Sequence, residues 1–246
     1  MAGSASDGSG ERFAGVVLLA AGEGERYRGA VPKLMTPLEG QPLITLAART
    51  VVRLPFVREL VLVANPKLRE DIAAAMSRLE PEIESAGMKV SLCDGGETRS
   101  DSVAQGLDAI SSECVLIHDG SRPLATAALF KRVLDAVEPG VGAVPVIEAR
   151  DSLLALDDRN EISGYLERPA IRLVQTPQGF ITSEYRAARR QVGREASAFT
   201  DDGSLFLAAG YRLVMVPGEE ENLKITYLGD LRFLPGLLAE GGKHRR

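Results

Sequence analysis

Two cations lie in a glycine-rich stretch that directly follows the first apolar run of the chain. Residues 19–33 read LAAGEGERYRGAVPK, which places Arg26 and Lys33 after several small residues. Small residues allow the backbone to approach a ligand closely, and exposed N–H groups suit a phosphate. The stretch lacks the third glycine of a dinucleotide-binding fingerprint, and Ala30-Val31 stands where a P-loop has Lys and Ser or Thr. It predicts either a phosphate-binding loop of another kind or a solvated turn with surface cations.

Two further loops carry residues suited to a nucleotide. Gly95-Gly96 follows a short apolar run, and adjacent glycines allow backbone amides to reach a flat base, to which Ser102 can add a hydroxyl. Asp119 follows the apolar run 114–118, a common position for a Mg²⁺ ligand near phosphates. Arg122 can bind a phosphate through two parallel hydrogen bonds. A plain Gly-Gly turn and a helix cap at Asp119 are the alternatives, although a cap leaves Arg122 unexplained.

Two titratable side chains lie within apolar surroundings. His118 ends the run 114–118, and we expect it to pack in the core rather than act as a catalyst. Lys224 lies between Leu223 and Ile225. A lysine in such a segment either extends its amine out of a core strand or directs it at an anion.

Strands and helices alternate along the chain, and this order predicts how these loops are placed. Short apolar runs predict strands over 13–21, 59–64, 89–93, 114–118, 142–147 and 211–216. Helical spacing predicts helices over 43–54, 68–79, 98–110, 125–137, 183–192, 201–209 and 228–238. The alternation indicates a parallel sheet, whose ligands bind at the carboxyl ends of the strands. Residues 148–180 break the pattern and predict a lid or an interaction arm.

Composition agrees with an α/β protein and excludes several other classes. The 246 residues are 45% hydrophobic and include 25 Gly, which is typical of an aliphatic core around a parallel sheet. The formal net charge is -5 and no basic stripe is present, so we expect no nucleic-acid partner. Cys93 and Cys114 lack the spacing of a metal site and are expected to be buried.

The ends of the chain complete these expectations. We expect residues 1–11 to be a disordered lead-in without the features of a signal peptide, and residues 239–246 to be a tail. The longest apolar run, 16–21, is too short to cross a bilayer, so we expect no membrane partner and a cytoplasmic protein. Residues 12–238 are then a single domain with 148–180 as an excursion.

Five motifs together resemble one enzyme family. They are Ala20-Ala21-Gly22-x-Gly24-x-Arg26 with Pro32-Lys33, Gly95-Gly96-x-x-Arg99-x-Asp101-Ser102-Val103, His118-Asp119-x-x-Arg122-Pro123, Thr176-Pro177-Gln178-x-Phe180 and Asn222-Leu223-Lys224-Ile225-Thr226. In this order they resemble the 2-C-methyl-D-erythritol 4-phosphate cytidylyltransferases of isoprenoid precursor biosynthesis. The resemblance implies an α/β, Rossmann-like nucleotidyltransferase fold, with a mostly parallel sheet flanked by helices. It also implies a protruding β-arm, here 148–180, that helps form a homodimer.

The resemblance implies a reaction and a role for each matched residue. CTP and 2-C-methyl-D-erythritol 4-phosphate would give 4-diphosphocytidyl-2-C-methyl-D-erythritol and diphosphate. Arg26, Lys33, Arg168 and Lys224 would be catalytic, with Arg168 reaching in from the partner's arm. The nucleotide would be bound by Ala20, Ala21, Gly22, Gly24, Gly95, Gly96, Glu97 and Ser102. The acceptor would be bound by Asp119, Gly120, Arg122, Ser152, Arg168, Thr176, Thr200 and Lys224, and Asp119 would also hold Mg²⁺ or another divalent cation.

Departures from the family pattern leave an alternative acceptor and an alternative class of function. Glu97 stands where Asp is frequent, and the arm has Ser152 and Leu154 where the family has Thr and Lys. The related ribitol-5-phosphate cytidylyltransferases are the first alternative, and residues 99–103 resemble them less closely. A non-catalytic nucleotide sensor is the second, but it would not need Arg26 and Lys33.

Overall fold

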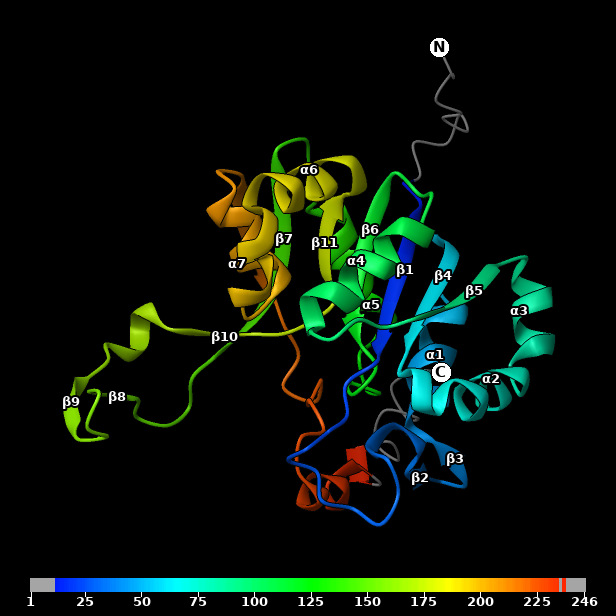
Figure 1. The fold of residues 1–246 in the computed structure, drawn as a ribbon, viewed down its shortest axis with the longest axis horizontal. Coiled ribbons are helices and arrows are strands. Elements are labelled where there is room, and N and C mark those ends of the chain that lie inside the picture. Colours follow the sequence, from blue (N-terminus) through cyan, green and yellow to red (C-terminus); the bar gives the residue numbers. More distant parts are fainter. Residues whose placement is uncertain (1–11, 235, 238–246) are drawn as a thin grey trace.

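A computed structural model describes residues 12–234 and 236–237. The expected lead-in, 1–11, and the expected tail, 239–246, lie outside the described residues. The central sheet has eight strands in the order β10-β7-β11-β6-β1-β4-β5, with β12 also paired to β7 (Figure 1). Its strands are β1 (Ala14–Ala20), β4 (Val57–Ala64), β5 (Lys89–Asp94), β6 (Cys114–Asp119), β7 (Val141–Glu148), β10 (Arg172–Val174), β11 (Gln178–Ile181) and β12 (Arg212–Pro217).

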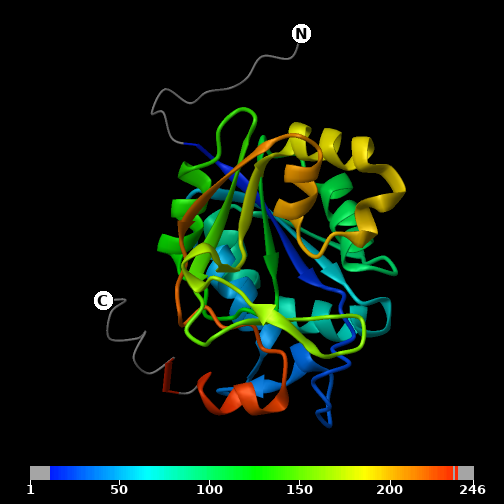
Figure 2. The same cartoon turned by 90° about the vertical axis from the view of Figure 1, so that its left-hand side faces the viewer.

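Helices cover both faces of this sheet (Figure 2). They are α1 (Leu43–Val52), α2 (Arg69–Ser77), α3 (Glu80–Ala86), α4 (Arg99–Ala109), α5 (Ala127–Asp135), α6 (Thr182–Val192) and α7 (Asp202–Ala208). Successive strand side chains point to opposite faces, so Val16 and Leu18 of β1 pack with α1, α2 and α5. Val17 and Leu19 pack with α4, α6 and α7. Because β1 is buried along its whole length, its sequence is a continuous apolar run.

The predicted mainly parallel sheet is confirmed, with one insertion that the sequence did not reveal. β1 pairs in parallel with β4 and β6, β4 with β5, and β7 with β12. β11 instead lies between β6 and β7 and runs antiparallel to both. Gly179 permits this, because a Cβ there would lie 2.8 Å from Val133 Cγ1 on the covering helix α5.

Two predicted helices differ from the structure. The expected helix 68–79 is present as the shorter α2. The 3-10 helix η2 (Pro66–Leu68) precedes it, and a separate helix, α3, follows at residue 80. The expected closing helix 228–238 begins as the 3-10 helix η5 (Leu228–Arg232), and its last residue lies outside the described residues. The Asp230 carboxylate accepts the N–H groups of Thr226 and Tyr227, which favours a tight first turn.

Only part of the stretch 148–180 projects from the body. β8 (Leu154–Leu156) and β9 (Ile162–Tyr165) form a separate hairpin that stands away from the sheet (Figure 1). The 3-10 helix η3 (Arg168–Ala170) follows, and β10 and β11 then rejoin the sheet. The projecting arm is therefore shorter than the excursion that the sequence predicted. None of the helices within the described ranges combines the length and apolar character needed to cross a bilayer.

Candidate active site

A cavity of about 830 Å³ lies beyond the carboxyl ends of β1, β4, β5 and β6. Parallel pairing brings the loops after these strands to one edge of the sheet, as the strand order predicts. The lining residues are Leu19, Ala21, Gly22, Glu23, Gly24, Glu25, Arg26, Lys33, Leu34, Asn65, Pro66, Lys67, Gly95, Gly96, Glu97, Thr98, Arg99, Ser102, Asp119, Ser121, Lys224 and Thr226. Most sequence-predicted site residues are thus brought together.

The glycine-rich stretch after β1 is anchored beside the cavity by Tyr27. Gly24 has a φ of +70°, which favours glycine, and its carbonyl accepts the N–H of Tyr27 at 2.7 Å. The Tyr27 hydroxyl donates to Thr36 Oγ1 at 2.8 Å, and its ring is buried. Arg26, which precedes Tyr27, and Lys33 both line the cavity.

The two glycines after β5 are required by close contacts. A Cβ on Gly95 would lie 2.3 Å from Ala21 Cβ, and one on Gly96 would lie 2.3 Å from Asp101 Cβ. Gly96 N–H donates to Ser102 Oγ at 3.2 Å, and the Ser102 hydroxyl donates to the Thr98 carbonyl at 3.0 Å. These contacts hold the turn against the start of α4. They also use both glycine N–H groups, because Gly95 N–H donates to the Ala64 carbonyl, so the amides that were expected to reach a base are bonded within the protein.

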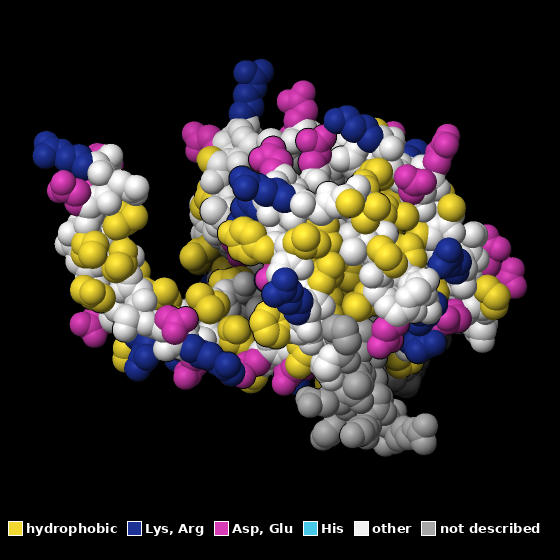
Figure 3. Space-filling view, turned by 90° about the horizontal axis from the view of Figure 1, so that it is seen from below, with side chains coloured by type: hydrophobic (Ala, Val, Ile, Leu, Met, Phe, Trp, Pro, Cys, Tyr) yellow, Lys and Arg dark blue, Asp and Glu magenta, His cyan; other side chains and the backbone are white. Residues whose placement is uncertain are grey.

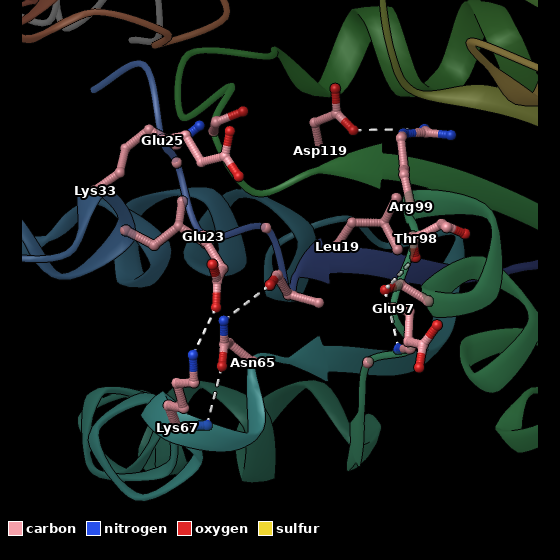
Figure 4. A pocket seen from close by; sticks show the side chains of 18 of the residues that line it. Leu19, Glu23, Glu25, Lys33, Asn65, Lys67, Glu97, Thr98, Arg99 and Asp119 are labelled. Carbon is pink, nitrogen blue, oxygen red and sulfur yellow. Dashed lines mark hydrogen bonds and ion pairs between the residues drawn. The ribbon is translucent and has the colours of Figure 1, made fainter. Parts of the chain in front are cut away.

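Asp119, the last residue of β6, is surrounded by three cations, two of which come from distant parts of the chain. Lys224 Nζ lies 2.7 Å from Oδ2 of Asp119. Arg99 Nη2 lies 3.4 Å from Oδ1 (Figure 4). Arg122 Nε is 4.0 Å from Oδ2. Burial alone would raise the pKa of Asp119, but the charges of Arg99, Lys224 and Arg122 hold that pKa well below its usual range. The carboxylate therefore stays ionised.

Lys33 lies in a site that disfavours its own charge. Burial, together with the positive charges of Lys224 and Arg26, lowers the pKa of Lys33, while Asp119 and Asp230 partly oppose this shift. A cavity lined by Arg26, Lys33 and Lys224 is suited to binding an anion with several charges.

His118 supports the backbone of Asp119 through the hydroxyl of Thr176. Burial lowers the pKa of His118 to about 4, so the ring is neutral at pH 7, and it is 1% exposed. Nε2 lies 3.2 Å from the Arg122 carbonyl and Nδ1 lies 3.0 Å from Thr176 Oγ1. Nε2–H donates to the carbonyl, and Nδ1 accepts the Thr176 hydroxyl. The expected core role of His118 is confirmed.

Several residues with an implied binding role lie behind the cavity wall. Arg122 is buried, and its Nη1 donates to the Asn222 carbonyl at 2.7 Å. Thr176 Oγ1 accepts the N–H of Asp119 at 3.1 Å, and Gly120 N–H donates to the Leu19 carbonyl at 2.9 Å. Ala20 is buried within β1. In this structure these four residues support the wall and the Asp119 backbone.

Three other residues with implied roles lie away from the cavity of their own chain. Ser152 and Arg168 belong to the arm, where both are exposed and Arg168 donates to the Arg150 carbonyl at 3.0 Å. Thr200 is exposed just before α7. None of the three is among the lining residues, so within one described chain the cavity forms without them.

The sequence reading missed a second contact of Arg99. Arg99 Nη2 lies 2.8 Å from Asp202 Oδ2, and Asp202 Oδ1 accepts the Tyr185 hydroxyl at 2.7 Å. This buried chain links α4, α6 and α7 to Asp119. Arg99 and Asp202 are both visible in the sequence, but nothing there indicates that residues 103 positions apart meet.

Comparisons with known proteins agree on one family. The pattern of the 2-C-methyl-D-erythritol 4-phosphate cytidylyltransferase (IspD) family matches residues 14–239. The chain is 34% identical to a protein of that name from Cereibacter sphaeroides, over 91% of this chain and 96% of that protein. The crystal structure of a protein of that name from Thermus thermophilus matches with a TM-score of 0.70 and 32% identity, over 92% of this chain and 98% of that chain.

Other relatives are longer than this chain. A bifunctional enzyme IspD/IspF from Anaeromyxobacter dehalogenans is 37% identical over 93% of this chain, which spans 58% of that protein. Two more bifunctional relatives are each covered over 56% of their length. Since the family match spans almost the whole chain and the fold and cavity agree with it, the chain belongs to the 2-C-methyl-D-erythritol 4-phosphate cytidylyltransferase family.

Proposed function

We propose that the protein transfers the cytidylyl group of CTP to 2-C-methyl-D-erythritol 4-phosphate and releases diphosphate. The observation that carries this proposal is the convergence of Arg26, Lys33 and Lys224 on one cavity that is bordered by two glycine-rich loops. Such a cavity suits a reaction between polyanions, and the names of the relatives supply the substrates.

The chemistry requires charge stabilisation rather than a general base. An oxygen of the acceptor phosphate attacks the α-phosphorus of CTP, and a new phosphorus–oxygen bond forms. The bond from the α-phosphorus to the oxygen bridging the β-phosphorus breaks, and its electron pair leaves with diphosphate. The acceptor phosphate is already anionic at pH 7, so no protein group has to remove a proton. Catalysis then rests on positioning and on neutralising charge in the transition state.

Different lining residues act on the α-phosphate, the nucleotide and the acceptor phosphate. Arg26 and Lys33 stabilise the negative charge that develops around the α-phosphate, and the loops at Gly22–Gly24 and Gly95–Gly96 border the space for the nucleotide. Lys224 neutralises the acceptor phosphate, and Asp119 fixes the Lys224 amine. Neutral His118 and Thr176 hold the Asp119 backbone in place.

Asp119 fits a Mg²⁺ ion that is bound mostly by substrate. Mg²⁺ is often held by one or two carboxylates, with phosphate oxygens and water completing the octahedron. Among the residues that the structure describes, no group of three His, Cys, Asp or Glu side chains converges, so the protein supplies few ligands. The ionised Asp119 carboxylate would be one ligand, and the bound ion would neutralise phosphate charge.

The arm supports a homodimer. Leu156, Ile162 and Tyr165 on the hairpin are 51%, 62% and 72% exposed. Figure 3 shows hydrophobic side chains along the projecting arm, and exposed apolar side chains gathered in this way are typical of a surface that binds another protein. Arg168 and Ser152 on the arm then reach the acceptor in the cavity of the second copy. We also propose a cytoplasmic enzyme without nucleic-acid or membrane partners.

Diphosphate release tests the reaction. Purified protein with CTP, Mg²⁺ and 2-C-methyl-D-erythritol 4-phosphate should release one diphosphate per nucleotide joined to the acceptor. Release with ribitol 5-phosphate but not with methylerythritol phosphate would contradict the proposed acceptor. Release with neither compound, together with tight CTP binding, would favour a nucleotide sensor.

A further inference from the structure

The glycine-rich stretch at 21–26 is tied to the turn after β4 by two side chains that belong to no motif discussed above. Asn65 Nδ2 donates to the Ala21 carbonyl at 3.1 Å, and Lys67 Nζ lies 2.8 Å from Glu23 Oε1. Figure 4 shows Lys67 joined to both Glu23 and Asn65, at the end of the cavity away from Asp119. Among the described residues, these are the two side-chain hydrogen bonds that reach residues 21–26.

The hydrogen bond of Asn65 and the ion pair of Lys67 differ in burial and therefore in strength. Asn65 is 6% exposed, and both ends of its amide are used, because Oδ1 accepts the N–H of Lys67 at 2.9 Å. A buried hydrogen bond of this kind is costly to lose. The side chains of Lys67 and Glu23 are 79% and 59% exposed, so their ion pair is weak and sensitive to salt.

The position of the stretch matters because it carries Arg26. Residues 22–25 are small or exposed, and they have few apolar contacts that would hold them. Gly95 N–H donates to the Ala64 carbonyl at 2.8 Å, and Gly95 packs against Ala21. Ala21, Asn65 and the Gly95 turn are thus one connected edge of the nucleotide space.

We propose that Asn65 and Lys67 are positioning residues for the nucleotide, which fix the stretch 21–26 so that Arg26 meets the triphosphate. This inference rests on the proposed function. It assigns to the turn after β4 a part in CTP binding that depends on the amide of Asn65 and on the pairing of Lys67 with Glu23.

Asn65→Asp separates positioning from local structure. Aspartate keeps the oxygen that accepts Lys67 N–H, so the turn stays capped, but it replaces the donor to the Ala21 carbonyl with a repelling oxygen. We expect roughly a tenfold rise in the Kd for CTP, measured by calorimetry. The urea unfolding midpoint should fall, because the buried hydrogen bond to Ala21 is lost, but the variant should stay folded and the KM for the acceptor should stay unchanged. Unchanged CTP binding in the folded variant would overturn the inference.

A second set of variants distinguishes positioning from simple charge attraction. If the pair positions the stretch, Glu23→Gln and Lys67→Gln each raise the Kd for CTP about two- to fivefold, and the double variant resembles either one. If Lys67 only attracts phosphate, Glu23→Gln lowers the Kd by removing a negative charge, which would overturn the inference.

Glu25→Gln is the matched control for that set. Glu25 lines the same cavity, and no ion pair joins it to another described residue, so its variant reports the effect of charge alone. We expect Glu25→Gln to lower the Kd for CTP or leave it unchanged. A rise equal to that of Glu23→Gln would contradict a specific role of the pair. If the unaltered protein does not bind CTP, the proposed function fails instead, and the two failures are distinguishable.

Discussion

Lys33 shows how a single residue combines charge with an environment that opposes it. Its amine shares the cavity with Arg26 and Lys224, and burial adds to the repulsion between these cations. A cation held in this way gains most when a polyanion arrives, because the ligand relieves the repulsion and the reaction places more negative charge nearby. The same repulsion lowers the pKa of Lys33. Both the charge of Lys33 and its lowered pKa have measurable effects on the reaction.

Removal of the Lys33 amine should slow the chemical step. We expect Lys33→Ala to lower kcat/KM for CTP by about 10²–10³-fold, the usual effect of losing one charge-stabilising donor. Steady-state diphosphate release measures this change. Lys131→Ala is the control, because Lys131 is exposed on α5 and pairs with Asp135. A loss below about fivefold for Lys33→Ala would place the charge stabilisation elsewhere in the cavity.

The lowered pKa of Lys33 should appear in the pH dependence of the reaction. The charged form of a lysine is lost as the pH rises through its pKa. An ordinary lysine has a pKa of about 10.4, so the alkaline decrease of kcat/KM should begin at a lower pH than that. The charges facing Lys33 are those of Arg26, Lys224, Asp119 and Asp230. Lys33→Arg keeps its charge throughout, so the alkaline limb should move to higher pH. If the alkaline decrease of kcat/KM occurred at the same pH in both proteins, a group other than Lys33 would be responsible for it.

At the scale of elements, β6 contributes buried residues to the core and ends with a residue of the site. It lies between β1 and β11, and its last two residues are His118 and Asp119. The neutral His118 ring, the Thr176 hydroxyl and the Asp119 N–H form one chain of hydrogen bonds that joins β6 to the segment before β11. The same contacts stabilise the sheet and fix the carboxylate.

His118 should make stability depend on pH in a defined window. Its pKa is about 4 in the folded protein and about 6.5 in the unfolded chain, so the unfolded chain binds more protons between these values. The free energy of unfolding should therefore fall by up to about 3 kcal/mol from this group as the pH drops from 6.5 to 4. Urea titrations at several pH values measure this.

His118→Gln removes the titrating group and keeps a donor and an acceptor. The variant should lose less stability than the unaltered protein over that window. Carboxylates titrate in both proteins, including Glu59, where hydrogen bonds from Lys89, Ser111 and Ser112 outweigh burial and lower the pKa to about 2. Equal slopes in the two proteins would show that His118 does not titrate as proposed.

At the scale of the whole molecule, the arm divides the implied acceptor site between distant regions. Ser152 and Arg168 project with the hairpin, while Lys33, Asp119 and Lys224 line the cavity of the body. A homodimer in which each arm serves the other cavity would unite them. The protein should then have a native mass of twice 26.3 kDa at micromolar concentration.

Mixing two inactive variants tests this sharing of sites. Lys33→Ala disables a cavity, and Arg168→Ala disables an arm, so each homodimer should be nearly inactive. After subunit exchange, a mixed dimer has one cavity with Lys33 that is served by an arm with Arg168. An equal mixture should regain about a quarter of the unaltered activity, if the losses arise from these charges alone. No recovery in a mixture shown to contain mixed dimers would mean that Arg168 acts within its own chain.

Local sequence determined most of the elements and the types of residue at the site. Short aliphatic runs such as that of β1 can be buried only as central strands, and helical spacing marks segments such as α5. The motifs that carry Arg26, Gly95-Gly96 and Asp119 were visible because each lies at or just after the end of such a strand, whereas Lys224 was visible only as a lysine between two apolar residues. Parallel pairing then implied that they share one edge of the sheet.

Tertiary structure alone decided which of these residues touch and what holds them. β11 is short, so only its pairing with β6 and β7 makes it a strand. The contacts of Arg99 with Asp202 and of Asn65 with Ala21 join residues far apart in the chain, and no local pattern encodes them. Local preferences follow from neighbouring residues, whereas the ionised state of Asp119 and the lowered pKa of Lys33 depend on charges that meet only after folding.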